Sequence, residues 1–232
     1  MIAHFADSMK LPPADAYIFD IDGTLLVTKD LVHWNALHQA MIEAYGVDAT
    51  IDGIPYHGMT DLSILRAALA RAGITDPAFE ANLPKALAVV RREVEKERRE
   101  IMPQVCPGIP YLLQNLKSQG KLLGVASGNL ETVAWHKIEA ASLRDFFSFG
   151  FFSDGCESRA GIFRKALEHV VAQIGRNARV CFIGDTPSDI RAAREIGASI
   201  VAVASGTFSL EDLSACSPDV CISDCGELLA AD

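Results

Sequence analysis

Short apolar segments alternate with segments of helical periodicity along most of this 232-residue chain, and this alternation constrains its fold more than any other feature. Several of the apolar segments are almost continuously hydrophobic, as parallel strands are when both faces of their sheet are covered. Strands that alternate with helices form crossover units, so the pattern predicts an α/β fold with a doubly wound, Rossmann-like parallel sheet. The predicted strands are Ala16–Phe19, Leu122–Ala126, Phe149–Phe152, Val180–Ile183, Ile200–Val203 and Val220–Ile222. The predicted helices between them are Ile109–Gln119, Leu130–Ala141, Gly161–Ile174, Ser188–Ile196 and a short one near Leu210–Ala215.

One long interval interrupts the alternation after the first predicted strand. From about Leu26 to Met102 the sequence contains no convincing strand, and Asp61 and Gly73 are suited to begin and to end a helix there. A series of helices in this place predicts an all-helical domain inserted into the α/β core. Its predicted helices are Asp30–Tyr45, Asp61–Ala72 and Pro77–Ile101. The resulting division is residues 1–27 and 103–232 for the core and residues 28–102 for the inserted domain.

Polar residues gather where three of the predicted strands end. Open α/β sheets bind ligands at the carboxyl ends of their strands, so these residues are expected to meet. Turns and helix caps explain one acid in each loop, but they do not explain the spacings D-x-D and D-x-x-x-D along one edge. Clustered carboxylates repel one another unless a cation neutralises them, and hard oxygen ligands of this kind suit Mg²⁺. The residues are Asp20, Asp22, Gly23 and Thr24 after the first strand, Ser127, Gly128 and Asn129 after the second, and Asp185 and Asp189 after the fourth.

Three motifs in this order resemble those of the haloacid dehalogenase superfamily of phosphohydrolases: DIDGTL, SGN and GDTPSD. They extend from Asp20 to Asp189, so the resemblance spans nearly the whole chain, and the first and last motifs are the specific ones. The helical insertion after the first motif resembles the α-helical, C1-type cap of this family. In cap type and length the chain is similar to phosphoglycolate phosphatases and also to β-phosphoglucomutases.

The resemblance implies roles for the residues of the three motifs. Asp20 would be the nucleophile that forms an aspartyl-phosphate, and Asp22 would be the general acid and then the base. With Asp20 and the backbone carbonyl of Asp22, Asp185 would bind Mg²⁺, and Asp189 would support the metal directly or through water. The second acid points to phosphate esters, since a dehalogenase has no alkoxide to protonate. The expected phosphate-binding groups are Ser127, the backbone N–H groups of Gly23 and Gly128, and the neighbouring Thr24 and Asn129.

A positive side chain is expected between the second and third motifs, where the family often has a lysine in a G-K-P context. This sequence has no G-K-P there. Arg159, expected just ahead of a predicted helix, is the preferred candidate because a guanidinium can hold Asp20 and phosphoryl oxygens bidentately. Lys165, more than a turn inside that helix, is the alternative, and Arg164 is a weaker one.

The inserted domain is expected to select the leaving group, because the core recognises only phosphate. His57 and Thr60, in the stretch YHGMTD ahead of a predicted helix, are candidates for substrate contact. Thr28, His33 and Trp34 are further candidates for the lining of the cleft. The leading hypothesis is a Mg²⁺-dependent phosphatase acting on a small phosphomonoester, such as phosphoglycolate or a sugar phosphate. A β-phosphoglucomutase-like isomerase is the alternative.

Charge and hydropathy limit the expected partners and location. A formal net charge of -9 argues against nucleic acid and anionic membranes, although a local positive site can still bind a small anion. No apolar run approaches the roughly 18 residues of a membrane span, and the opening MIAHFADSMK lacks the apolar region of a secretion signal. With six cysteines and no C-x-x-C pair, a cytoplasmic location with reduced thiols is expected. The sequence makes no prediction of oligomeric state.

Overall fold

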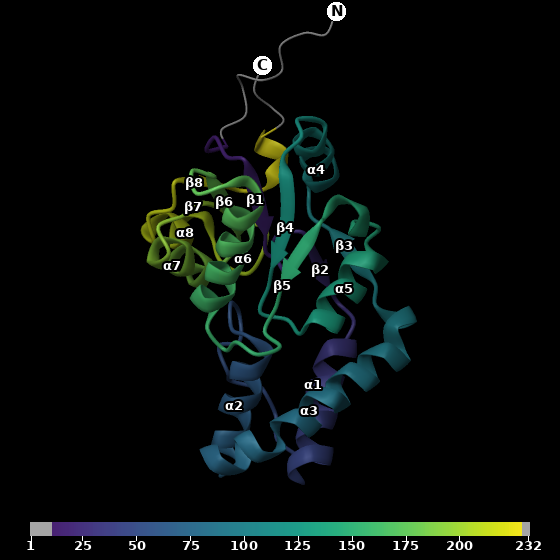
Figure 1. Ribbon diagram of the computed structural model, residues 1–232. Coiled ribbons are helices and arrows are strands. Elements are labelled where there is room, and N and C mark those ends of the chain that lie inside the picture. Colours follow the sequence, from purple (N-terminus) through teal and green to yellow (C-terminus); the bar gives the residue numbers. More distant parts are fainter. Residues whose placement is uncertain (1–10, 229–232) are drawn as a thin grey trace, which may run out of the picture.

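Six parallel strands form the central sheet of the computed structural model, which describes residues 11–228 (Figure 1). The opening stretch MIAHFADSMK therefore lies outside the described residues. The strands are β1 (Ala16–Phe19), β4 (Leu122–Ala126), β5 (Phe149–Phe151), β6 (Val180–Gly184), β7 (Ser199–Val203) and β8 (Val220–Ile222). Their order across the sheet is β5-β4-β1-β6-β7-β8, which confirms the predicted doubly wound α/β fold.

Helices cover both faces of the sheet, as strands that are almost continuously apolar require. Tyr17 and Phe19 of β1 pack in an apolar cluster on one face, and the alternate residues Ala16 and Ile18 pack in a second cluster on the other. Full burial of a side chain such as Phe19 stabilises the fold by about 1.5–3 kcal/mol. The first face is covered by α4 (Ile109–Ser118) and α5 (Glu131–Ala140), and the second by α6 (Arg159–Ile174), α7 (Pro187–Glu195) and α8 (Leu210–Ala215). Short 3₁₀ helices are Arg98–Glu100, Arg144–Phe146 and Cys225–Leu228.

The point where the strand order reverses lies beside β1. The chain adds β4 and β5 on one side of β1, and then β6, β7 and β8 on the other. In register, Phe19 pairs with Val125 of β4 and with Ile183 of β6, so the three strands end close together. A crevice at such a reversal is the usual ligand site of an open α/β sheet.

A group of three helices lies beyond the carboxyl ends of the strands. In Figure 1 the arrowheads of β4 and β5 point toward these helices, which are α1 (Val32–Tyr45), α2 (Asp61–Arg71) and α3 (Asp76–Glu97). Their apolar core also takes in Leu130 and Val133, at the start of α5, so the group packs against the edge of the α/β core. No helix within residues 11–228 combines the length and the apolar character that crossing a membrane requires. Fully buried members of the helical core are Met41, Leu65, Leu69, Phe79 and Val90.

A two-stranded antiparallel ribbon connects the sheet to these helices. It consists of β2 (Leu26–Thr28) and β3 (Pro103–Val105), with Leu26 opposite Val105. The prediction that no strand lies between about Leu26 and Met102 is therefore wrong for β2. A three-residue strand shows no periodicity, and its partner lies far away in the sequence. The proposed boundaries of the inserted domain fall within this ribbon, so we keep residues 28–102 as a proposed domain.

Two helix starts differ from the prediction in ways that matter for the site. The hydroxyl of Thr60 accepts from the N–H of Ser63 and caps α2, so Asp61, expected as the cap, is instead the first residue of the helix. Ser158 caps α6, so Arg159 lies in the first turn and not ahead of it. Both helix starts differ from the prediction by one or two residues, an offset that a sequence pattern does not resolve.

Candidate active site

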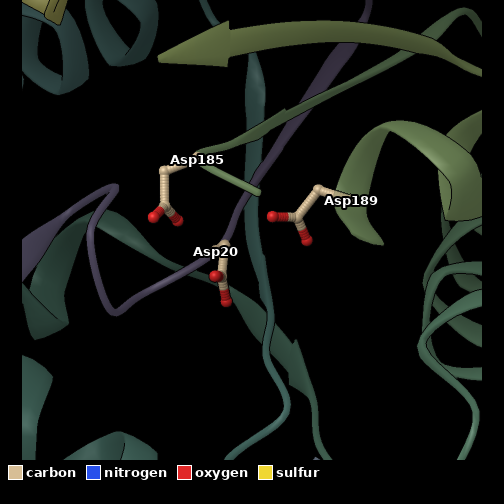
Figure 2. A group of neighbouring side chains, drawn as sticks. All are labelled: Asp20, Asp185 and Asp189. Carbon is tan, nitrogen blue, oxygen red and sulfur yellow. The ribbon is translucent and has the colours of Figure 1, made fainter. Parts of the chain in front are cut away.

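Three buried aspartates meet at the carboxyl edge of the sheet (Figure 2). Asp20 follows β1, Asp185 follows β6, and Asp189 lies in the first turn of α7. One carboxylate oxygen of each lies within 4.8 Å of the others. Because their exposed fractions are only 5%, 4% and 0%, water screens their mutual repulsion poorly.

A buried arginine, Arg159, supplies positive charge to this cluster. Its Nη2 lies 2.7 Å from Asp20 Oδ2 and 2.6 Å from Asp189 Oδ1, and its Nε donates to Asp189 Oδ1 at 2.8 Å. Lys165, the alternative cation, lies on the exposed side of α6, as does Arg164. The contacts agree with the preference for Arg159. One guanidinium among three carboxylates still leaves an excess of negative charge.

Burial and the neighbouring negative charges raise the pKa of two of the acids. Burial, opposed by Arg159 and reinforced by Asp189 and Asp22, raises the pKa of Asp20 to about 6. Burial and the nearby Asp20 and Asp189 raise the pKa of Asp185 well above its ordinary value. A bound cation would relieve both effects, because it favours the ionised carboxylates.

The two carboxylates that follow strands are suited to hold a hard cation, whereas Asp189 has its oxygens committed elsewhere. Asp20 Oδ1 is buried and has no hydrogen-bond partner among the described residues. Asp189 Oδ2 instead accepts from the N–H of Thr186 at 3.1 Å and from its hydroxyl at 2.7 Å, in a capping box, while Oδ1 receives Arg159. Asp189 thus fixes Arg159 and the start of α7, and the donor set that remains is carboxylate oxygen, which suits Mg²⁺.

Two glycines make room for Asp185. A Cβ on Gly23 would lie 2.2 Å from Asp185 Oδ2, and one on Gly206 would lie 1.8 Å from the same atom. Gly23 also has a φ of +85°, which disfavours any side chain. Thr24 is fully buried and donates to Asp185 Oδ1 at 3.1 Å. Gly23 and Thr24 therefore shape the Asp185 site, and the N–H of Gly23, expected to bind phosphate, donates to the carbonyl of Leu26.

The second acid of the D-x-D pair has a separate set of partners. Lys137 Nζ lies 2.8 and 2.9 Å from the two carboxylate oxygens of Asp22, and Asn129 donates to Asp22 Oδ2 at 2.7 Å. Partial burial opposes ionisation of Asp22, but Lys137 and Asn129 outweigh it and hold the pKa of this carboxyl below its ordinary value. Asn129 also donates to Ser127 Oγ at 2.8 Å, which leaves the Ser127 O–H to donate toward the cavity.

Lys137 was absent from the sequence prediction, although a signal for it exists. Leu130, Val133, Ala134 and Ile138 follow the i, i+3, i+4, i+8 pattern of a buried helix face, and Lys137 occupies position i+7 of the same face. A lysine inside an apolar stripe needs a buried partner. Asp22 is that partner.

A cavity of about 510 Å³ joins these residues to the helices beyond the sheet. It is lined on one side by the residues at the strand ends and on the other by apolar and aromatic residues of the inserted segment. Of the predicted site residues, Thr24, Thr60 and Asp189 do not line it; Thr60 is buried and its hydroxyl donates to the carbonyl of Glu157. The predicted residues that line it are Asp20, Asp22, Gly23, His57, Ser127, Gly128, Asn129, Arg159 and Asp185, together with Thr28, His33 and Trp34.

Two residues of the YHGMTD stretch differ in their contacts. His57 is exposed and lies 3.2 Å, through Nδ1, from the hydroxyl of Thr207, a neighbour on the core side of the cavity. Gly58 approaches α7 so closely that a Cβ would lie 2.8 Å from Thr186 Oγ1. Gly128 plays the matching part on the core, where a Cβ would lie 2.4 Å from the carbonyl oxygen of Met59. Close backbone approach therefore joins the two sides of the cavity.

Comparison with known proteins agrees with this geometry. The model of the family "Haloacid dehalogenase-like hydrolase" matches residues 17–203. A phosphoglycolate phosphatase from Synechococcus elongatus is 31% identical over 219 residues, which cover 93% of this chain and 96% of that protein. A phosphoglycolate phosphatase from Caulobacter vibrioides is 25% identical over 194 residues, 81% of this chain and 78% of its own length.

A solved structure shares the fold at lower identity. It is that of a CbbY mutant from Rhodobacter sphaeroides in complex with xylulose-(1,5)bisphosphate, with a TM-score of 0.70, 21% identity and coverage of 93% of this chain and 96% of that one. The match extends over the sheet and the helices beyond it, so the architecture is that of these proteins. The chain therefore belongs to the haloacid dehalogenase-like hydrolases, and it is a phosphatase of that family.

Proposed function

We propose that this protein is a Mg²⁺-dependent phosphatase that hydrolyses a small-metabolite phosphomonoester through an aspartyl-phosphate on Asp20. The observation that carries the proposal is the state of Asp20. One of its oxygens is held by Arg159, the other is buried without a hydrogen-bond partner within residues 11–228, and the residue lines a cavity shared with Asp22. A fixed nucleophile next to a proton-transfer group is what phosphoryl transfer requires.

The first half of the reaction transfers the phosphoryl group to the enzyme. A carboxylate oxygen of Asp20 attacks phosphorus, the bond from phosphorus to the ester oxygen breaks, and Asp22 gives its proton to the departing oxygen. Arg159 holds Asp20 in place and offsets charge on the phosphoryl oxygens, while the hydroxyl of Ser127 donates to one of them. The backbone around Gly128 completes this side of the phosphate site.

The second half releases phosphate and restores the enzyme. Asp22, now a carboxylate, takes a proton from water, and the water oxygen attacks phosphorus as the bond to Asp20 breaks. Asp20 returns as a carboxylate, and Asp22 leaves this step protonated. Before the next ester binds it gives up this proton, because Lys137 and Asn129 favour its ionised form. Asp20 and Asp185, with the backbone carbonyl of Asp22, are the groups suited to hold Mg²⁺, and Asp189 supports them through Arg159. When bound, Mg²⁺ supplies positive charge that offsets the charge of the transferring group.

The dimensions of the cavity support a small substrate. A volume of about 510 Å³ is within the usual range for a small-molecule site. Trp34, Leu37, Ile51, Tyr56 and Met59 line the side that the leaving group would face, and His57 adds a polar group there. The names of the relatives make phosphoglycolate the first ester to test. The acidic net charge of -9 disfavours nucleic-acid substrates. We also propose that the enzyme is cytoplasmic.

Phosphate release from a panel of phosphomonoesters, with Mg²⁺ and with a chelator, tests this proposal. The panel contains phosphoglycolate, sugar phosphates and nucleotides. Release that depends on Mg²⁺, with one ester strongly preferred, is expected. Activity that requires a sugar bisphosphate and yields an isomer would favour the mutase alternative, and absence of release from every ester by the folded protein would refute the proposed function.

A further inference from the structure

The lysine on α5 has no part in the roles proposed above, although it is among the most buried charged residues of the site. Lys137 is 4% exposed. Its ammonium contacts both carboxylate oxygens of Asp22, at 2.8 and 2.9 Å, and Asn129 Oδ1 at 3.0 Å. A buried ammonium without compensating partners is strongly unfavourable, so the Lys137 side chain is restricted to the position in which it contacts Asp22 and Asn129. Asp22, in contrast, keeps about 42% of its side chain exposed and faces the cavity.

The third partner of Lys137 comes from the helices beyond the sheet. His33 of α1 places Nδ1 at 3.4 Å from Lys137 Nζ, and its Nε2 lies 3.0 Å from Asp61 Oδ2 on α2. Since Lys137 can only donate, Nδ1 accepts, and Nε2 carries the proton that goes to Asp61. Asp61 is 2% exposed, and the same oxygen accepts from the N–H of Leu130 at 2.8 Å.

Asp61 is held by contacts to the α/β domain and to α1. Its N–H donates to the carbonyl of Gly128 at 2.8 Å, next to the expected phosphate site. Its side chain joins the start of α5 to His33. The contacts Asp61–His33–Lys137–Asp22 therefore form a continuous polar chain from α2 and α1, through α5, to the loop after β1.

We propose that Lys137 is a positioning residue for Asp22, and that His33 and Asp61 hold Lys137 in that position. The inference rests on the proposed function, in which Asp22 transfers the proton. Asp22 must reach the ester oxygen in the first half of the reaction and a water molecule in the second, and a partly exposed aspartate in an open cavity has several rotamers to choose from. Two donors on one side, Lys137 and Asn129, restrict it to one. The acid of the core is thus aligned by residues of α1 and α2.

A substrate that needs no proton on its leaving group separates this role from others. 4-Nitrophenolate is a good leaving group and departs without a proton. With 4-nitrophenyl phosphate, the first half of the reaction therefore does not need Asp22 as an acid. The second half, hydrolysis of the aspartyl-phosphate, still needs Asp22 as a base. We therefore expect Lys137→Met to release one equivalent of nitrophenolate per active site at a rate within about threefold of the wild type. Steady-state turnover should then fall about 100-fold, as expected for a misplaced proton-transfer group.

An alkyl ester should give a different pattern with the same variant. Its leaving group needs the proton, so the first turnover also slows about 100-fold, while KM changes less than about threefold. His33→Asn should show the same burst and the same split with a smaller loss, because asparagine is too short to bridge Lys137 and Asp61. The matched controls are His38→Asn, on the same helix but paired with exposed Asp48, and Lys117→Met, whose ammonium contacts the carbonyl of Asp145 at the surface. Both controls should retain wild-type kinetics.

Three results would overturn the inference. A rise in KM for both esters without a burst would make Lys137 a substrate contact, and unchanged kinetics in folded Lys137→Met would leave it no role in positioning. A folded His33→Asn protein with wild-type kinetics would remove α1 from the polar chain. A wild-type protein that hydrolyses neither ester would instead refute the proposed function itself, and the inference with it.

Discussion

Replacing Asp20 with asparagine should stabilise the metal-free protein while it abolishes turnover. Burial, opposed by Arg159 and reinforced by Asp189 and Asp22, raises the pKa of Asp20 from an ordinary 3.8 to about 6. Each pKa unit corresponds to about 1.4 kcal/mol, so ionised Asp20 lowers the free energy of unfolding by about 3 kcal/mol once the pH exceeds its folded-state pKa. Asparagine has nearly the same shape and no charge, so this loss disappears.

The effect should depend on pH in a defined direction. Between the two pKa values the unfolded chain has released a proton that folded Asp20 still holds, so the free energy of unfolding falls as the pH rises through this window. The gain from Asp20→Asn should be about 3 kcal/mol near pH 7.5 and about half of that near pH 5. Urea unfolding in the presence of a chelator, followed by circular dichroism at both pH values, measures it.

The control is Asp145→Asn, because Asp145 is an exposed aspartate on the surface of the α/β domain. It should change the free energy of unfolding by less than about 0.5 kcal/mol at either pH. Asp20→Asn protein that is less stable than the wild type near pH 7.5 would show that the ion pair with Arg159 outweighs burial. A stabilisation that is the same at both pH values would show that charge is not its cause.

Further predictions concern the neighbours of Asp20. Arg159→Met should lower kcat at least about 1,000-fold, because it removes the guanidinium from a buried acid cluster, whereas Lys165→Met, at an exposed position of the same helix, should retain wild-type kcat. Equal losses in the two variants would contradict the assignment of the cation. Gly206→Ala should raise the Mg²⁺ concentration needed for half-maximal activity about tenfold or more, because its Cβ would displace Asp185. Gly155→Ala should leave that concentration unchanged, because its Cβ would meet no described residue within 4 Å beyond its two chain neighbours. A magnesium titration of phosphate release distinguishes the two glycine variants.

The core strands and the acid cluster were predictable because their signals are local. β1, β4 and β8 have the predicted bounds. Asp20 directly follows β1 and Asp185 directly follows β6, and both strands are apolar. Parallel strands that end together bring such residues to one place, whatever lies between them in the sequence. The order of the motifs therefore sufficed to predict the carboxylate cluster. The cation beside it was expected from the family resemblance, with Arg159 preferred and Lys165 as the alternative.

The contacts that cross between elements were not predictable in the same way. β2 forms because β3 is beside it, and neither three-residue segment is recognisable alone. Asp61 resembles a helix cap in sequence, but Thr60 is the cap. The carboxylate of Asp61 is therefore available to His33 and to the start of α5. Lys137 stood in a visible apolar stripe, yet its partner could be identified only when the loop after β1 and α5 were placed together.

The two acids of the D-x-D pair have opposite pKa shifts in the metal-free protein, and the proposed reaction must work against both. Asp20 attacks as a carboxylate, yet burial raises its pKa. A cation bound near the Asp20 oxygen that has no partner among the described residues would favour the ionised form, so metal binding would also activate the nucleophile. Asp22 must donate a proton, yet Lys137 and Asn129, against the effect of burial, hold its pKa low. A low pKa makes Asp22 a strong donor to an alkoxide but keeps it ionised at rest, so the arriving phosphate must supply the negative charge that favours its protonation. In its resting, ionised form Asp22 can thus act as the base of the second half of the reaction. It becomes the acid of the first half only when substrate is bound.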